Sequence, residues 1–224
     1  MLGTAALLFA ASPRSAVPEA RIVIHGTRTG THLEIEADGG RLLVRGRMAP
    51  RLSSLCRSGG RGTAACDLAG VGAIEIDTGP AGDKVEVLSK LPVPLTVHLG
   101  AGSDKFIGNG ERDTCYPEGT RRNRCIGGGG HDVCITGPRN TDCLGGPGND
   151  YCKAGDGSDG CWGGPGRDVC VMGGGEDGCH GGPGDDRLYG GSGADRLYGG
   201  PGFDYCDGGP GRGRSQGCEA GPEH

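Results

Sequence analysis

Aspartate and cysteine recur at a fixed spacing through the second half of this sequence. From residue 99 the chain divides into nine-residue units such as GGPGNDYCK (145–153) and GGPGRDVCV (163–171), with Asp sixth and Cys eighth. Carboxylates at a short regular interval repel one another unless a cation lies between them, and thiols at a suitable distance form disulfides. These residue types therefore indicate metal binding and covalent cross-linking.

No catalytic constellation accompanies this pattern. The six histidines form no H-E-x-x-H zinc motif, and no GK[ST] follows the Gly-rich segments. We also expect no nucleophile elbow of the hydrolase type. The sequence therefore predicts a protein that is not an enzyme and has no catalytic residues.

The composition limits the fold and the partners. The chain of 224 residues has 51 Gly and 14 Pro, and only 34% of its residues are hydrophobic, so a thick globular core is not expected. The net charge of −5 argues against a nucleic-acid partner. No apolar run approaches the ~18 residues of a membrane-spanning helix, so we predict no membrane span.

The twelve cysteines indicate an oxidising compartment, where disulfides persist. The alternative, a cytosolic metal-binding protein, would need close pairs such as C-x-x-C, and the sequence has none. Residues 1–16 contain a short Ala- and Leu-rich run followed by Ser-Pro-Arg-Ser-Ala, which predicts a signal peptide. We therefore expect a secreted, extracellular protein in which all twelve cysteines form disulfides.

The repeated unit resembles a known family. G-G-x-G-x-D-x-U-x, where U is large and apolar, is similar to the haemolysin-type (repeats-in-toxin, RTX) calcium-binding nonapeptide. The resemblance covers 99 to about 216, and ten of thirteen units keep the Gly and the Asp. It implies an all-β fold, a parallel β-roll with Ca²⁺ held between successive turns. This chain departs from the family mainly at U, where Cys replaces the larger apolar residues.

Two units make one coil of the roll, so the sixth-position residues stack in two columns. Because carboxylate and carbonyl oxygens suit Ca²⁺ better than zinc or copper, we expect calcium between stacked aspartates. Seven sites are predicted, five in the first column and two in the second. The expected ligands are Asp113, Asp132, Asp150, Asp168, Asp186 and Asp204 in the first column, and Asp159, Asp177 and Asp195 in the second. Asn123, Thr141 and Gly213 interrupt the second column.

The eighth-position cysteines allow two pairings. A ladder joins neighbours one coil apart, as Cys115–Cys134, Cys125–Cys143, Cys152–Cys170 and Cys161–Cys179. A cross-core pattern joins facing strands, as Cys115–Cys125, Cys134–Cys143, Cys152–Cys161 and Cys170–Cys179. Both leave Cys56–Cys66 and Cys206–Cys218. We favour the ladder, because stacked strands lie about 4.8 Å apart whereas facing sheets usually lie about 10 Å apart.

The rest of the chain is expected to flank the roll. Short alternating strands and an Asp38-Gly39-Gly40 hairpin signal predict an N-terminal β cap over 21–98, followed by the roll over 99–216 and a tail over 217–224. Within the cap, 79–87 looks like a worn nonapeptide. We expect Cys56 and Cys66 to bracket a Gly-rich loop.

The sequence therefore predicts calcium binding by a secreted, disulfide-clamped β-roll in which calcium drives folding. A different class stays open: a surface adhesin or carbohydrate-binding module with purely structural calcium and a cell-surface glycan or protein partner. Its candidate surface is an exposed aromatic strip. The candidates are Tyr151, Trp162, Tyr189, Tyr198 and Tyr205. A third reading is an accessory module of a longer enzyme.

Overall fold

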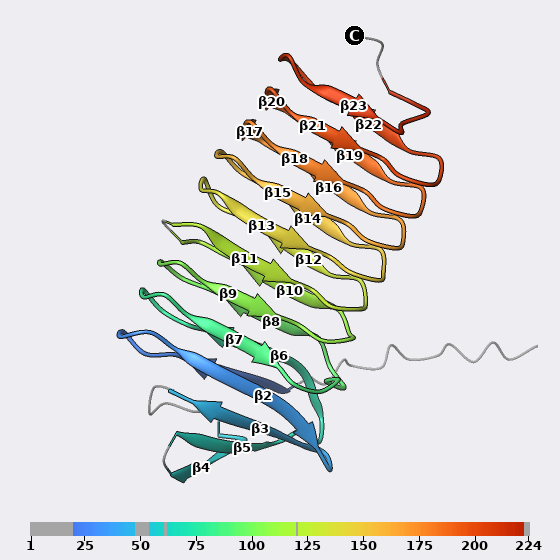
Figure 1. The fold of residues 1–224 in the computed structure, drawn as a ribbon. Coiled ribbons are helices and arrows are strands. Elements are labelled where there is room, and N and C mark those ends of the chain that lie inside the picture. The colour runs from blue at the N-terminus through green and yellow to red at the C-terminus, as the bar shows by residue number, and fades with distance from the viewer. Residues whose placement is uncertain (1–19, 48–53, 61, 120, 222–224) are drawn as a thin grey trace, which may run out of the picture.

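The computed structural model describes residues 20–47, 54–60, 62–119 and 121–221. All regular structure in these residues is β-strand, arranged as a parallel solenoid with an antiparallel region at its N-terminal end (Figure 1). The predicted all-β fold and its parallel β-roll are confirmed, with an antiparallel region at the N-terminal end. The expected signal peptide, 1–16, lies outside the described residues.

One sheet of the solenoid has nine strands, and every neighbouring pair in it is parallel. In spatial order they are β1 (Ala20–His25), β6 (Val71–Asp77), β8 (Leu95–His98), β10 (Asp113–Tyr116), β12 (Val133–Ile135), β14 (Tyr151–Lys153), β16 (Val169–Val171), β19 (Arg187–Tyr189) and β22 (Tyr205–Asp207).

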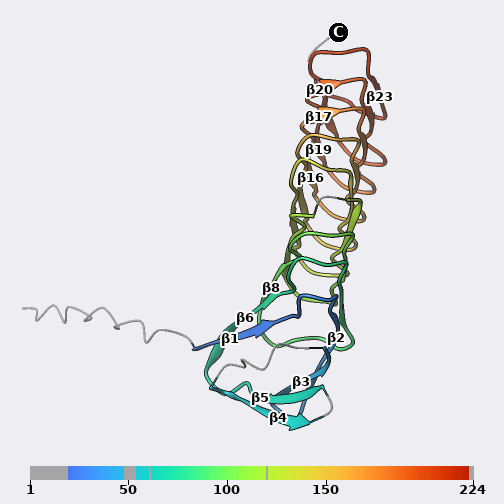
Figure 2. The same cartoon turned by 90° about the vertical axis from the view of Figure 1, so that its left-hand side faces the viewer.

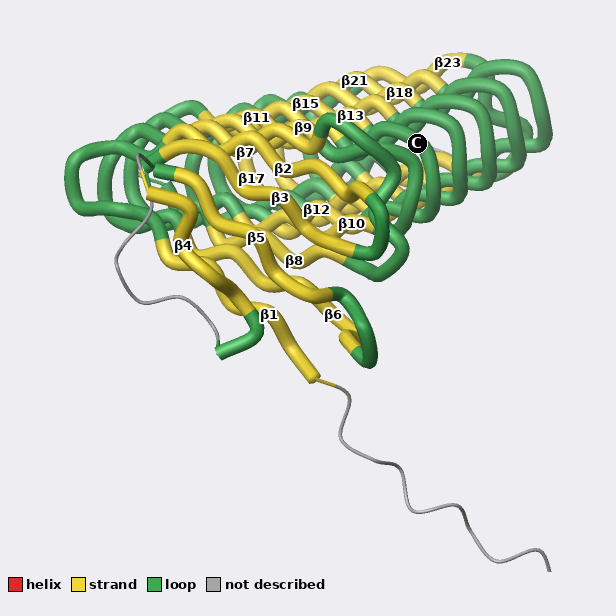
Figure 3. Tube along the Cα trace, turned by 90° about the horizontal axis from the view of Figure 1, so that it is seen from below, coloured by secondary structure: helices red, strands yellow, loops and turns green. Residues whose placement is uncertain are grey.

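The second sheet supplies the other side of each coil. Its parallel part runs through β2 (His32–Asp38), β7 (Lys84–Val87), β9 (Lys105–Ile107), β11 (Asn123–Ile126), β13 (Thr141–Leu144), β15 (Gly160–Trp162), β18 (Gly178–His180), β21 (Arg196–Tyr198) and β23 (Arg214–Gln216). A two-stranded sheet, β17 (Gly174–Gly175) with β20 (Ser192–Gly193), lies in the turns. Figure 3 shows the rows of strands flanked by turns on both edges.

The antiparallel region extends the second sheet beyond β2. It contains β3 (Arg41–Gly46), β5 (Thr63–Asp67) and β4 (Cys56–Gly60), in that order. The expected hairpin at Asp38-Gly39-Gly40 joins β2 to β3, and both glycines have positive φ. Cys56 and Cys66 flank the Gly-rich segment as expected, and they lie opposite each other on β4 and β5, the antiparallel strands that make up most of that segment.

The N-terminal strands differ in role from the expected cap. β1, β2, β6, β7 and β8 already stack in the two sheets of the solenoid, so only β3–β5 add antiparallel structure. The coil is wide at this end and narrows toward the C-terminus (Figure 2). Its wide end is filled by fully buried aliphatic side chains such as Ile22, Leu33 and Ile74, whereas cysteines line the narrow part.

Glycine permits the coils to stack closely. A Cβ on Gly148 would collide with the carbonyl oxygen of Gly130 in the preceding coil, and Gly148 has a φ of 153°. The turns of the roll therefore require glycine at such contacts. No helix that could span a membrane occurs in the part of the chain that the structure describes.

Candidate metal centre

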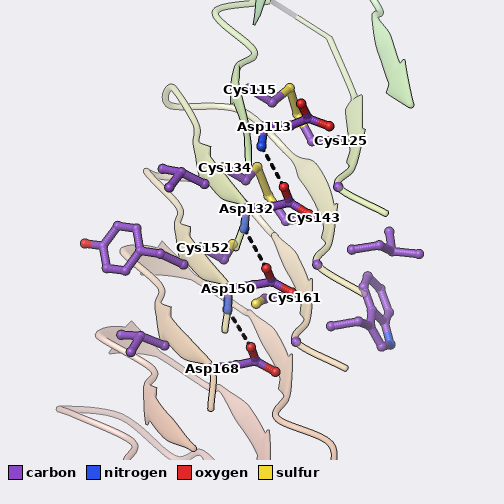
Figure 4. Close-up of a pocket in the computed structure, with 18 of the residues that line it drawn as sticks. Asp113, Cys115, Cys125, Asp132, Cys134, Cys143, Asp150, Cys152, Cys161 and Asp168 are labelled. Carbon is purple, nitrogen blue, oxygen red and sulfur yellow. Dashed lines mark hydrogen bonds between the residues drawn. A yellow bond between two sulfur atoms is a disulfide. The ribbon is translucent and has the colours of Figure 1, made fainter. Parts of the chain in front are cut away.

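The first column of aspartates forms a continuous chain of hydrogen bonds along one edge of the roll. The backbone N–H of Asp132 donates to Oδ1 of Asp150 at 2.7 Å, and that of Asp150 donates to Oδ1 of Asp168 at 2.7 Å (Figure 4). The same bond, at 2.7–2.8 Å, links Asp113 to Asp132, Asp168 to Asp186 and Asp186 to Asp204. The six predicted residues of this column are therefore brought together.

The second column repeats this arrangement with interruptions. Asp159 donates through its N–H to Asp177, and Asp177 donates to Asp195, so these three predicted residues also stack. At Asn123 the amide oxygen replaces the carboxylate and accepts the N–H of Asp104 at 2.8 Å.

Thr141 breaks the second column. Its N–H donates to Oδ1 of Asp159 at 2.6 Å, which continues the column toward the C-terminus. Toward the N-terminus the side chain of Thr141 does not accept the N–H of Asn123, which donates to the carbonyl of Asn140 instead. The column therefore loses one carboxylate in this coil.

Asp83 extends the second column toward the N-terminus. Its N–H donates to Oδ1 of Asp104 at 2.9 Å, and its own carboxylate accepts the N–H of Thr31. Asp83 was not among the predicted ligands, although the worn nonapeptide at 79–87 is the signal that marks it. The structure thus adds a stacked Asp83/Asp104 pair to the seven that were predicted.

Every column carboxylate except that of Asp113, whose Oδ2 accepts the N–H of Asn109 at 3.1 Å, keeps a buried oxygen without a partner. Oδ1 accepts the N–H of the previous coil, while Oδ2 has almost no exposed surface and no hydrogen bond. The aspartates that share this feature are Asp83, Asp104, Asp132, Asp150, Asp159, Asp168, Asp177, Asp186, Asp195 and Asp204. Orphaned buried acceptors are costly, so their regular recurrence indicates a missing positive partner.

Backbone oxygens complete the surroundings of Oδ2. A Cβ on Gly163 would overlap both Oδ2 of Asp168 and the carbonyl oxygen of Gly181, one coil further along. Gly145 stands in the same relation to Asp150 and to the carbonyl of Gly163. Carboxylate and carbonyl oxygens thus converge on a small space at each coil. This all-oxygen donor set fits Ca²⁺.

Burial also disfavours the charged form of these carboxyls. Desolvation raises the pKa of Asp113, Asp132, Asp159 and Asp168 from 3.8 to about 7. The pKa of Asp104, Asp150 and Asp186 rises to about 6 for the same reason, although a backbone N–H bond opposes each shift. A bound divalent cation would stabilise the ionised form that burial penalises.

The cysteines pair across the interior, not along the sheet. Cys115 bonds to Cys125 and Cys134 bonds to Cys143, with Cα–Cα distances of 6.3 and 6.4 Å. The favoured ladder pairing of these residues is therefore wrong. The facing strands of a coil that contains only small side chains lie much closer than the ~10 Å of packed sheets on which that preference rested.

The remaining cysteines divide into two groups. Cys56–Cys66 and Cys206–Cys218 form as expected. Cys152, Cys161, Cys170 and Cys179 are buried thiols, so the ladder bonds Cys152–Cys170 and Cys161–Cys179 are also absent. The sulfur atoms of Cys161, Cys170 and Cys179 lie within 4.8 Å of one another. Figure 4 shows this change from disulfides to free thiols along the interior.

The outward aromatic residues are split between the two sheets. Trp162, His180 and Tyr198 stack in a row on successive strands of the second sheet, with ring centroids 6.0 and 4.6 Å apart. Tyr151, Tyr189 and Tyr205 belong to the first sheet. The aromatic residues therefore do not line one face, and within the row the ring faces cover one another.

The C-terminal part of the chain contains the letters of a hydrolase motif, but not its structure. The letters G-x-S-x-G do occur once, at 213–217, contrary to the expectation of no such motif. Ser215 lies inside β23, and no helix follows it among the described residues up to 221. The strand–turn–helix context of a nucleophile elbow is therefore lacking at this position.

Part of the roll matches a known family of repeats. The family described as RTX calcium-binding nonapeptide repeat (four copies) matches residues 144–170 and 180–214. The chain therefore contains haemolysin-type RTX calcium-binding repeats, which confirms the resemblance, and these matched segments contribute aspartates to both columns. No curated protein and no solved structure matches the chain.

Proposed function

We propose that this chain is a secreted, non-enzymatic calcium-binding β-roll in which calcium drives folding. The observation that carries the proposal is the pair of columns in which buried Oδ2 atoms, which have no hydrogen-bond partner, lie next to backbone carbonyl oxygens of the following coil. The residues that would hold calcium are the column aspartates and the glycine carbonyls of the same turns.

Folding would depend on calcium for two reasons. Buried carboxylates that stack in every coil repel one another when ionised, and their raised pKa values reflect the cost of burying the charge. Glycine also loses more conformational freedom on ordering than other residues, and this chain has 51 of them. Calcium would supply the free energy that offsets both costs.

The disulfides would act as clamps on the same coils. Four bonds are present, and we include Cys152–Cys161 and Cys170–Cys179 as two further cross-core bonds that form in the oxidised protein. RTX repeats and disulfides are consistent with secretion, because disulfides persist in oxidising compartments.

The direct test is circular dichroism of the full chain with excess EDTA, with calcium and with magnesium. We expect a poorly ordered chain in EDTA, a β spectrum in calcium, and little response to magnesium, whose rigid octahedral geometry suits these turns less well. Calorimetry should find several calcium ions per chain. The same β spectrum with and without calcium, or no binding, would contradict the proposal.

A second candidate function is a surface adhesin or carbohydrate-binding module, favoured by the exposed row of Trp162, His180 and Tyr198. Sugars usually stack on free ring faces, and here the inner faces are occupied by neighbouring rings. A glycan array would test this candidate directly. A hit that Trp162→Ala removes while calcium binding persists would favour it over the first proposal.

A further inference from the structure

The first aspartate column does not stop at its last aspartate. The N–H of Asp204 donates to Oε2 of Glu219 at 2.8 Å. As inside the column, a backbone N–H of a column aspartate donates to a carboxylate of the next coil, and the length equals that of the bond from Asp186 to Asp204, 2.8 Å. Glu219 therefore occupies the position that an aspartate holds in each earlier coil.

The backbone around Glu219 continues the roll in the same way. Ala220 forms a parallel bridge with Tyr205, and its N–H donates to the carbonyl of Asp204 at 3.0 Å. Inside the roll the N–H of Tyr205 donates in the same way to the carbonyl of Asp186 at 2.9 Å. Ala220 therefore takes the place of the residue that follows the column aspartate.

This last turn is shorter than the others. Asp204 and Glu219 are separated by 15 residues, whereas the column partners Asp186 and Asp204 are separated by 18. Glutamate is one methylene longer than aspartate, so its side chain can span the shortened turn. The disulfide between Cys206 and Cys218, with Cα atoms 5.8 Å apart, holds the segment against β22.

The oxygen cradle is present at this end as well. Oδ2 of Asp204 is fully buried and has no hydrogen bond. A Cβ on Gly199 would overlap both this oxygen and the carbonyl oxygen of Gly217. Gly217 thus supplies the carbonyl that Gly199 supplies to the turn before it.

We propose that Asp204, Glu219 and the carbonyl of Gly217 form a terminal calcium site that the Cys206–Cys218 disulfide holds in place. The site rests on the proposed calcium function. Gly217 and Glu219 lie beyond the matched repeats, which end at 214. The site would place a cation and a covalent bond at the same turn, next to β22.

Native mass spectrometry of the full chain at saturating calcium tests the site by counting ions. Glu219→Gln should bind one ion fewer than the wild type. Glu176→Gln is the matched control, because Glu176 is an exposed glutamate in a repeat turn, outside the column, and it should keep the wild-type count. Asp204→Asn should lose two ions, since Asp204 also faces Asp186.

Hydrogen exchange supplies a local readout on the same proteins. The amides of Cys206 and Ala220, which bond to the terminal segment or to Asp204, should be protected in calcium and should lose that protection at least tenfold in Glu219→Gln. The double variant Cys206→Ser/Cys218→Ser should likewise lower the affinity of the terminal site for calcium. Amides of β16 should be unchanged in each case.

The outcomes separate the two proposals. A wild-type chain that binds no calcium overturns the calcium function and the terminal site together. A wild type that binds calcium while Glu219→Gln binds the same number overturns the terminal site alone. Loss of one ion in both Glu219→Gln and Glu176→Gln would also overturn it, because the effect would then follow charge and not position.

Discussion

Cys134 and Cys143 are bonded across the interior, with Cα atoms 6.4 Å apart, in the coil where Thr141 stands in place of a column aspartate. The neighbouring bond, Cys115–Cys125, lies in the coil where Asn123 makes the same kind of substitution. Under the proposed calcium binding, the second column would hold fewest cations here. The covalent bonds would then cross the roll at the place where stabilisation by cations is weakest.

The double variant Cys134→Ser/Cys143→Ser should destabilise the calcium-loaded chain by about 3 kcal/mol, the loop-entropy value for a bond of this span. Hydrogen exchange should accelerate over residues 121–144, because no aspartate pair supports that edge. Thermal unfolding in calcium, followed by local exchange, measures both effects. Cys56→Ser/Cys66→Ser is the control, because this disulfide closes a loop of nearly the same length. Its cysteines are separated by 10 residues, and Cys134 and Cys143 by 9. This control should leave exchange at 121–144 unchanged, and an equal response there would contradict the assignment.

Position within a column should determine how many ions a mutation removes. Asp168 bonds to Asp150 on one side and to Asp186 on the other, so Asp168→Ala should remove two calcium ions. Asp104 has an aspartate partner, Asp83, on one side only and faces Asn123 on the other. Asp104→Ala should therefore remove one ion. Calorimetry that gives the number of calcium ions bound per chain distinguishes these results. If both variants lost the same number of ions, this would argue against sites between stacked carboxylates.

The nine-residue period predicted most of the candidate site, because turn length and side-chain position both follow it. It failed where the turn length changes. Asp83 lies in a degraded unit, and Glu219 lies in a turn three residues short, so neither falls at an expected position. Glu219 was found only through its hydrogen bond with Asp204. For Asp83 the worn nonapeptide at 79–87 was a signal, but its place in the column is defined by its hydrogen bond with Asp104.

The disulfide pattern failed for a different reason. Sequence spacing gives the position of a residue along the coil but not the width of the coil. That width follows from packing, and a run of cysteines allows the facing strands to approach to a Cα–Cα distance of 6.3 Å at Cys115–Cys125. The glycines between Cys56 and Cys66 likewise suggested a loop, although 56–60 and 63–67 form paired strands.

Acid should stabilise the calcium-free chain and weaken the calcium-bound one. Burial raises the pKa of Asp132 and Asp168 from 3.8 to about 7, so the protonated folded form contributes stability that is complete below 3.8 and lost as pH rises through 7. Calcium needs the ionised form, so its affinity should increase over the same interval. Circular dichroism in EDTA should show more β structure near pH 5 than near pH 8, with calcium titrations showing the opposite trend. Parallel pH profiles in EDTA and in calcium would contradict this coupling.

The four buried thiols should oxidise in the cross-core pattern, as Cys152–Cys161 and Cys170–Cys179. Cys152 and Cys170 stack in register with Cys134, and Cys161 and Cys179 stack with Cys143, so each facing pair repeats the positions of a bond that is present. The sequence separation of 9 in Cys134–Cys143 is the same in both new pairs. Burial raises the pKa of Cys170 and Cys179, which slows thiolate exchange but does not alter the final pairing.

Non-reducing peptide mapping can resolve this pairing, because the chain offers a cleavage site between every two of these cysteines. Trypsin cuts after Lys153 and Arg167, and a glutamyl endopeptidase cuts after Glu176, which separates all four residues onto different peptides. We expect links of 152 to 161 and of 170 to 179, and Cys152→Ser should leave Cys161 open to alkylation after denaturation. Links of 152 to 170 would restore the ladder for these coils. Four alkylatable thiols in protein from an oxidising compartment would mean that cysteine here serves only as a small core residue, so that calcium alone holds the coils between Cys143 and Cys206.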